Sequence, residues 1–148
     1  MKSFLSNLIQ NIDKIYVNPH LYLFGDLNGV LCLCFHTVFQ NKNEKENTHT
    51  LPRLGLTIDE YRYIFEYFLE YNYKFISFKE IQGKLESNCK YIHITFDDGY
   101  FNNTRIIPIL EEYSIPGHFF VVTNNIINSN KFWWDIVYSN RISSGRPL

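Results

Sequence analysis

Four short apolar runs, separated by amphipathic segments, dominate the hydrophobic pattern of the chain. They lie at 29–35, 74–78, 91–96 and 118–122, and branched and aromatic residues at these lengths are typical of strands. Because segments of helical periodicity lie between them, strand and helix alternate along the chain. Repeated βα units predict an α/β fold with parallel strands, either a barrel or a doubly wound sheet.

The amphipathic segments predict three main helices. Thr57 and Glu60 have the spacing of a capping box, in which each side chain satisfies a first-turn amide. Further helices are predicted at 101–113 and 131–140, with a shorter one at 79–85. The helix after the capping box carries these residues on its apolar side: Ile58, Tyr61, Phe65, Phe68 and Leu69.

Polar and terminal segments complete the expected organisation. Residues 40–49 predict a surface loop whose charges are solvated. Residues 1–28 predict a helical lead-in, and the tail at 142–148 has no apolar register. We expect residues 1–148 to form a single incomplete domain. The lead-in is expected to form a short amphipathic helix through Leu5, Leu8, Ile12 and Ile15.

The composition of the chain excludes some classes of binding partner. The 148 residues are 45% hydrophobic and 18% aromatic with a net charge of −1, which argues for a globular chain and against binding to nucleic acid or an anionic membrane surface. The high aromatic content suits a core or a sugar-stacking surface equally. No signal peptide or transmembrane run is evident, so a cytoplasmic location is expected.

The spacing of the three cysteines fits neither a disulfide framework nor a zinc or redox motif. Cys32 and Cys34 lie two apart on a predicted strand, Cys89 is distant, and no Cys-x-x-Cys spacing exists. Buried free thiols are therefore expected, in a reducing compartment.

The most informative segment is the end of the third apolar run. Asp97, Asp98 and Gly99 follow it directly, so a buried strand would deliver two carboxylates to the edge of the sheet. Asp-Gly is also a hairpin signal, but a helical pattern follows instead of a second strand. Since neighbouring strand residues point in opposite directions, one carboxylate can bind a cation while the other handles a proton.

Residues 95–100 (TFDDGY) resemble the first motif of the polysaccharide deacetylases, the NodB-homology or carbohydrate esterase family 4 group. Gly117-His118 departs from that family, in which Ala-Thr is usual. Several other segments are similar to family segments: LCFHTV at 33–38, IPIL at 107–110, Ile115-Pro116, FFVV at 119–122 and FWWD at 132–135.

The resemblance implies that the chain forms the N-terminal part of a distorted (β/α) barrel. It also implies an enzyme that hydrolyses N-acetyl groups of amino sugars in a glycan. It assigns Asp97 as the general base and Asp98 as a ligand of a divalent metal, with zinc expected. The bound cation would supply hydroxide near neutral pH and polarise the acetyl carbonyl. The substrate-binding residues are not identified by the motif, and the weak candidates are Tyr100 and His36.

The histidines that the family places later are missing. The family's second motif contributes two metal ligands spaced His-x-x-x-His, whereas no two histidines of this chain are four apart. Zinc sites normally use three protein ligands and a water, and a full barrel needs about 200 residues or more. We therefore expect a truncated deacetylase in which 91–148 form the start of the homology region.

Alternatives stay open for the function and for single residues. An incomplete domain without activity, or a module that associates with another polypeptide, fits the same sequence. A nucleotide-sugar glycosyltransferase also uses Asp-Asp-Gly after a strand, but the neighbours of the motif differ here. His93 is expected to be a packed core residue. Trp133, Ile136 and Val137 are expected to pack into the core from one helix face.

Overall fold

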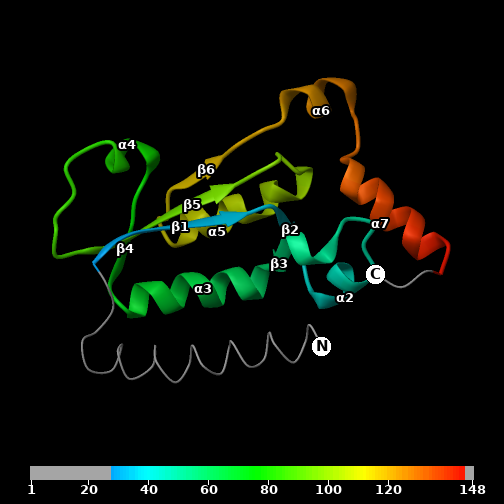
Figure 1. The fold of residues 1–148 in the computed structure, drawn as a ribbon. Coiled ribbons are helices and arrows are strands. Elements are labelled where there is room, and N and C mark those ends of the chain that lie inside the picture. The colour runs from blue at the N-terminus through cyan, green and yellow to red at the C-terminus, as the bar shows by residue number, and fades with distance from the viewer. Residues whose placement is uncertain (1–27, 146–148) are drawn as a thin grey trace, which may run out of the picture.

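A parallel four-stranded sheet organises the structure, a computed structural model that describes residues 28–145 (Figure 1). Its central strand is β5 (Lys90–Phe96), which pairs along its whole length with β1 (Gly29–Phe35). On the other edge, β4 (Tyr73–Phe75) pairs with the first half of β5 and β6 (Gly117–Phe119) with the second half. The predicted α/β fold with parallel strands is confirmed.

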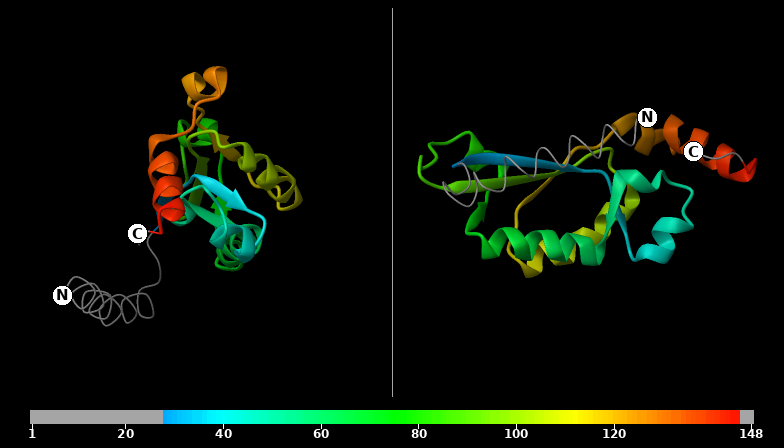
Figure 2. Two further views of the ribbon diagram at one scale, coloured as in Figure 1. Left: turned by 90° about the vertical axis from the view of Figure 1, so that its right-hand side faces the viewer. Right: turned by 60° about the horizontal axis from the view of Figure 1, so that its bottom comes forward.

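The helices lie around this sheet, with α3 (Ile58–Glu70) and α5 (Ile107–Glu112) contributing to its core and α7 (Trp133–Ser143) beyond the carboxyl ends of the strands (Figures 1 and 2). The capping box at the start of α3 is present as predicted. The remaining elements are β2 (Thr37–Phe39), α2 (Lys42–Glu46), the 3-10 helix η1 (Pro52–Leu54), β3 (Gly55–Thr57), α4 (Phe78–Ile81), the 3-10 helix η2 (Phe101–Ile106) and α6 (Thr123–Asn128).

The core forms where alternate side chains of β5 meet α3 and α5. Ile92, Ile94 and Phe96 are fully buried there, against Tyr61 and Phe65 of α3. These positions are two apart on the strand, so they share one face of the sheet. Burial of this face fixes the register of β5 and therefore the position of the residues that follow it.

The first strand is less buried than its composition predicts. Val30 and Leu31 are 39% and 42% exposed, and Cys32 and Cys34 are exposed free thiols. Within residues 28–145, only its carboxyl half packs against the core, through Leu33 and Phe35. The expectation of a buried strand with buried thiols is wrong because β1 is an edge strand of the described sheet.

Several predicted boundaries also change. The segment 101–113 divides into η2 and α5, with Pro108 at the start of α5, where a missing amide costs little. The strands predicted at 74–78 and 118–122 are shorter, because only three residues of each pair with β5. Leu69 is 42% exposed and lies off the buried face of α3.

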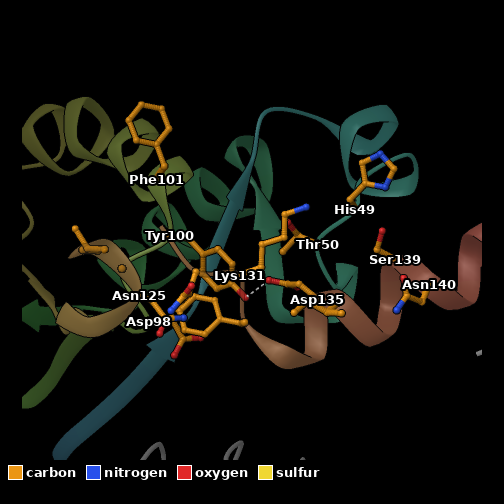
Figure 3. A pocket seen from close by; sticks show the side chains of 15 residues that line it. His49, Thr50, Asp98, Tyr100, Phe101, Asn125, Lys131, Asp135, Ser139 and Asn140 are labelled. Atoms are coloured by element: carbon orange, nitrogen blue, oxygen red, sulfur yellow. Dashed lines mark hydrogen bonds between the residues drawn. The ribbon is translucent and has the colours of Figure 1, made fainter. Parts of the chain in front are cut away.

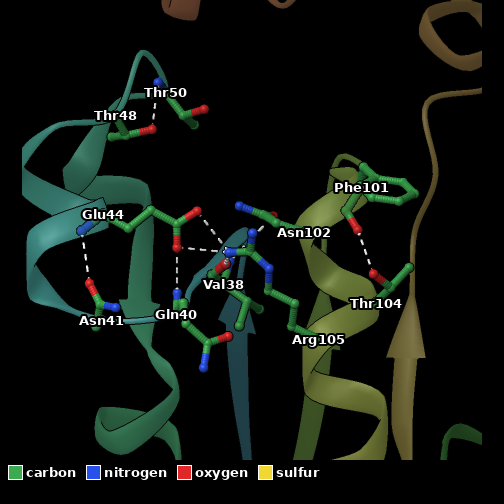
Figure 4. A network of polar contacts seen from close by, with 10 residues as sticks. All are labelled: Val38, Gln40, Asn41, Glu44, Thr48, Thr50, Phe101, Asn102, Thr104 and Arg105. Atoms are coloured by element: carbon green, nitrogen blue, oxygen red, sulfur yellow. Dashed lines mark hydrogen bonds and ion pairs between the residues drawn. The ribbon is translucent and has the colours of Figure 1, made fainter.

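The polar segment 40–49 is not a simple loop, because it contains α2 and is fastened to η2 (Figure 4). Arg105 Nη1 donates to both carboxylate oxygens of Glu44, at 2.9 and 2.8 Å, and the Gln40 amide donates to Glu44 at 2.6 Å. Desolvation alone would raise the pKa of Glu44, but these donors outweigh it and hold the pKa below its usual value. The prediction that the charges of this segment are solvated is therefore wrong for Glu44, whose carboxylate is paired with Arg105.

The prediction that one apolar face of the last helix packs into the core is also wrong. Trp133, Ile136 and Val137 are between 45% and 69% exposed, and Tyr138 is the buried residue of α7. Among residues 28–145, no helix is both long and apolar enough to cross a membrane. The amphipathic helix predicted near the N-terminus lies outside the described residues.

Candidate active site

The two aspartates leave β5 through an unusual turn. The Asp97 amide donates to the Phe35 carbonyl at 2.7 Å, which continues the parallel pairing one residue beyond β5. Asp98 and Gly99 then both adopt left-handed conformations, with φ values of 70° and 72°. A β-carbon on Gly99 would come within 3.0–3.3 Å of Val121. Left-handed backbone at a non-glycine residue such as Asp98 costs free energy, and such positions cluster at functional sites.

The carboxylates of Asp97 and Asp98 have different surroundings. Asp97 lies beside β1, where the Cys34 thiol donates to Asp97 Oδ2 at 3.3 Å. His36 completes this group, since ligand atoms of the three side chains all lie within 4.8 Å of one another. Asp98 instead lines a cavity at the carboxyl ends of the strands. The turn thus gives the adjacent acids different surroundings, although His36 is near both.

The cavity has a volume of about 390 Å³ and lies between the strand end and α7 (Figure 3). Asp98, Tyr100 and Asp135 contribute acidic and hydroxyl groups to its wall, and Phe132 contributes an aromatic ring. A ligand pocket beyond the carboxyl ends of parallel strands is the arrangement expected of α/β folds.

Asp135 organises one wall of this cavity. Its Oδ2 accepts a hydrogen bond from the Tyr100 hydroxyl at 2.7 Å, and its Oδ1 accepts one from the Leu51 amide at 3.0 Å. Trp134 Nε1 donates to the Tyr100 oxygen, also at 2.7 Å. Burial, together with the bond to Asp135, raises the pKa of Tyr100, so its hydroxyl stays protonated at neutral pH. The sequence offered FWWD only as a familiar segment and gave no role to Asp135.

Both aspartates retain acceptor capacity. Asp97 Oδ1 and Asp98 Oδ2 are buried and have no hydrogen-bond partner among residues 28–145. Burial raises the pKa of Asp98 above its ordinary value of 3.8; the nearby charges of Asp97 and Asp135 add to this increase, and His36 opposes it. Buried acceptors without partners are costly, and a cation or substrate donor would relieve that cost.

His36 lies at the candidate site, whereas His93 lies in the core with His118 packed near it. His36 lies close to both aspartates, at the break between β1 and β2. His93 is 5% exposed and its Nδ1 lies 3.0 Å from the Ile76 carbonyl, which confirms the predicted core role. His118 packs near His93, with the ring centroids 6.1 Å apart. His20 lies outside the described residues.

Replacement of Asp98 by asparagine is expected to stabilise the fold, by roughly 0.5 kcal/mol at pH 7 after allowing for the solvent that partly reaches the carboxyl. The folded-state pKa of Asp98 is raised, so the folded protein binds more protons than the unfolded one as the pH rises above about 3.8, and stability falls through that window. Asparagine has no charge to desolvate and tolerates the left-handed backbone.

Urea unfolding at pH 3 and pH 7 measures this effect. The stability advantage of Asp98→Asn should be larger at pH 7 than at pH 3, where the wild-type carboxyl is protonated. The exposed residue Asp59 is the control, because Asp59→Asn makes the same chemical change outside the cavity. A variant less stable than wild type at pH 7 would show that the ionised Asp98 carboxylate supports the fold.

Comparison with known proteins shows similarity in sequence and in fold. Residues 84–141 match the polysaccharide deacetylase family. The chain is also similar to the solved structure of a de-N-acetylase from Aggregatibacter actinomycetemcomitans, with 26% sequence identity and a TM-score of 0.52. That alignment covers 61% of this chain and 36% of the other, so this chain spans about a third of that protein's length. No curated protein matches the sequence.

The predicted resemblance to the polysaccharide deacetylases is therefore confirmed, and residues 84–141 carry the match to that family. The similarity to the de-N-acetylase also supports the expected fold, a partial (β/α) barrel. The matched segment contains both aspartates and Asp135.

Proposed function

We propose that this chain supplies the general base and one metal ligand of an enzyme that removes N-acetyl groups from amino sugars in a glycan. The observation that carries the proposal is the pair of adjacent carboxylates at the carboxyl end of β5, each with a buried oxygen that has no hydrogen-bond partner in the described part of the chain. The deacetylase match over 84–141 supports the reaction class.

Asp97 acts as the general base. Its Oδ2 accepts a hydrogen bond from the Cys34 thiol. This leaves Oδ1 without a described partner and able to take a proton. A base must lie within hydrogen-bonding reach of the attacking water, and a carboxylate at a strand end, ahead of a sharp turn, can be approached by one.

Asp98 holds the divalent cation, for which zinc is our expectation. The residues present fit such a group, because Asp98 Oδ2 is a buried acceptor without a described partner and the His36 imidazole lies nearby. When bound, the cation supplies Lewis-acid polarisation of the acetyl carbonyl and lowers the pKa of a bound water. The remaining ligands would come from a His-x-x-x-His pair on further polypeptide, since this sequence contains none.

The cavity beside Asp98 accommodates the sugar. The ring of Phe132 lies 5.0 Å from that of Tyr100 and stacks on that of Trp134 at 4.7 Å, so the wall combines aromatic surface with hydroxyl and carboxylate groups. Sugars bind to such walls through ring contacts and hydrogen bonds. We propose Tyr100 as a substrate-contacting residue on this basis, while His36 belongs to the group around Asp97.

Release of acetate from N-acetylglucosamine oligomers tests the function. A protein that combines this segment with the histidine pair, loaded with a divalent cation, should release acetate; a chelator should abolish the release, and added Zn²⁺ should restore it. The 148-residue chain alone should be inactive, because it lacks the histidine pair. A protein so completed that binds the cation yet releases no acetate from any N-acetylated glycan would favour the alternative of a non-catalytic domain.

A further inference from the structure

A group of three different donor side chains shares Asp97, the proposed base, with the deacetylase site and extends from it towards β1. Cys34 and His36 come from the end of β1 and the residue after it, and Asp97 follows β5. Their ligand atoms lie within 4.8 Å of one another. The two segments are aligned by the parallel register, in which Cys34 is opposite Thr95 and Phe35 opposite Phe96. The grouping therefore follows from the sheet itself.

We propose that Cys34, His36 and Asp97 form a second cation site, selective for thiophilic divalent ions such as Zn²⁺, Co²⁺ and Cd²⁺. Thiolate, imidazole and carboxylate are all ligands that zinc accepts, and three protein ligands leave a fourth position for water. This site goes beyond the proposed function, which uses Asp98 as a ligand and gives no role to Cys34.

The observed spacing suits tetrahedral coordination. Zinc lies about 2.3 Å from sulfur and about 2.0–2.2 Å from nitrogen or oxygen, so neighbouring ligand atoms of a tetrahedron are about 3.3–3.6 Å apart. Cys34 Sγ and Asp97 Oδ2 are already 3.3 Å apart. The ligand atom that His36 offers lies within 4.8 Å of those offered by Cys34 and Asp97, so a small side-chain movement would bring it to the tetrahedral separation.

The surroundings also allow a cation to enter. Cys34 is exposed and His36 and Asp97 are half-buried, so solvent reaches the group. Asp97 Oδ1 is buried without a described partner and can support bidentate binding. Because an ion held here would withdraw Asp97 from proton transfer, occupation of this site and action of Asp97 as a base exclude each other.

Titration of the 148-residue chain with Co²⁺ under a non-thiol reductant tests the proposal. Bound thiolate gives cobalt an intense near-ultraviolet charge-transfer absorption, which carboxylate and imidazole ligands alone do not. Wild type should show this band at saturation, and Cys34→Ser should lose it. Cys32→Ser is the matched control, because Cys32 is an exposed thiol on the same face of the same strand and is outside the group.

Two further variants complete the test. His36→Ala should keep a band but weaken Co²⁺ affinity at least tenfold, whereas Asp98→Asn should retain the band and its affinity. This second result separates the site from the proposed deacetylase metal, so a failure of acetate release would leave the proposal intact. A wild-type chain without the band, a band that survives Cys34→Ser, or one lost in Cys32→Ser would overturn it.

Discussion

Replacement of Asp97 by asparagine is expected to lower the rate of acetate release by about 10²–10⁴-fold, the usual contribution of a general base. Asparagine keeps the shape and a hydrogen-bond acceptor for the Cys34 thiol, but its side chain cannot take a proton at neutral pH. The backbone contact to Phe35 involves the residue 97 amide and survives the change. The loss should therefore appear in kcat with little change in the folding of the site.

The measurement compares kcat and cation content of the protein completed with the histidine pair and of its variants. To keep the Cys34 group out of the comparison, cation uptake is measured in a Cys34→Ser background. Asp97→Asn should retain the cation there and Asp98→Asn should lose it, whereas Asp59→Asn, a change at an exposed acid, should behave like wild type. If Asp97→Asn loses the cation while Asp98→Asn keeps it, the two roles are reversed.

The position of the motif could be predicted because its signals are local. A run of branched and aromatic residues predicts β5, and the acidic pair before Gly99 predicts a sharp exit from that strand. Both features occur in the structure. The capping box of α3 is equally local, since its donors and acceptors lie within four residues, and it is present as predicted.

The neighbours of the motif could not be predicted, because they depend on contacts across the chain. Tyr100 reaches Asp135 across 35 residues of sequence, and Cys34 reaches Asp97 across 63. No periodicity encodes such pairs. The outward face of Trp133 has the same origin: an apolar stripe indicates that a helix has a face to cover, but only the packing of the whole chain decides what covers it.

The turn at Asp98 lowers the stability of the fold, and it places a carboxylate where it can bind a ligand. The residue has a left-handed backbone and a carboxyl whose pKa is raised by burial, so the fold would be more stable without the charge. Such a position persists when the surrounding structure determines it. Here the rigid neighbour is β5, whose buried face holds the strand end in place.

Replacement of Phe96 by alanine is therefore expected to have the largest effect on stability, about 3–5 kcal/mol. Phe96 is fully buried and is the last residue of β5, directly before Asp97. Its ring stacks on Phe119 with centroids 5.0 Å apart and contacts Phe35 and Tyr61 at 5.7 and 5.9 Å. Alanine would leave a cavity between β1, β5, β6 and α3 that these rings cannot refill without moving.

Chemical denaturation measures this loss, and Phe101→Ala is the matched control, because Phe101 is 89% exposed five residues later. The control should change the free energy of unfolding by no more than about 0.5 kcal/mol. Because Phe96 anchors the turn that follows it, Phe96→Ala should also weaken cobalt binding at Cys34 under conditions where the variant is still folded. Equal stability losses in the two variants would mean that the carboxyl end of β5 does not depend on the packing of Phe96, and that some other contact holds the aspartates in place.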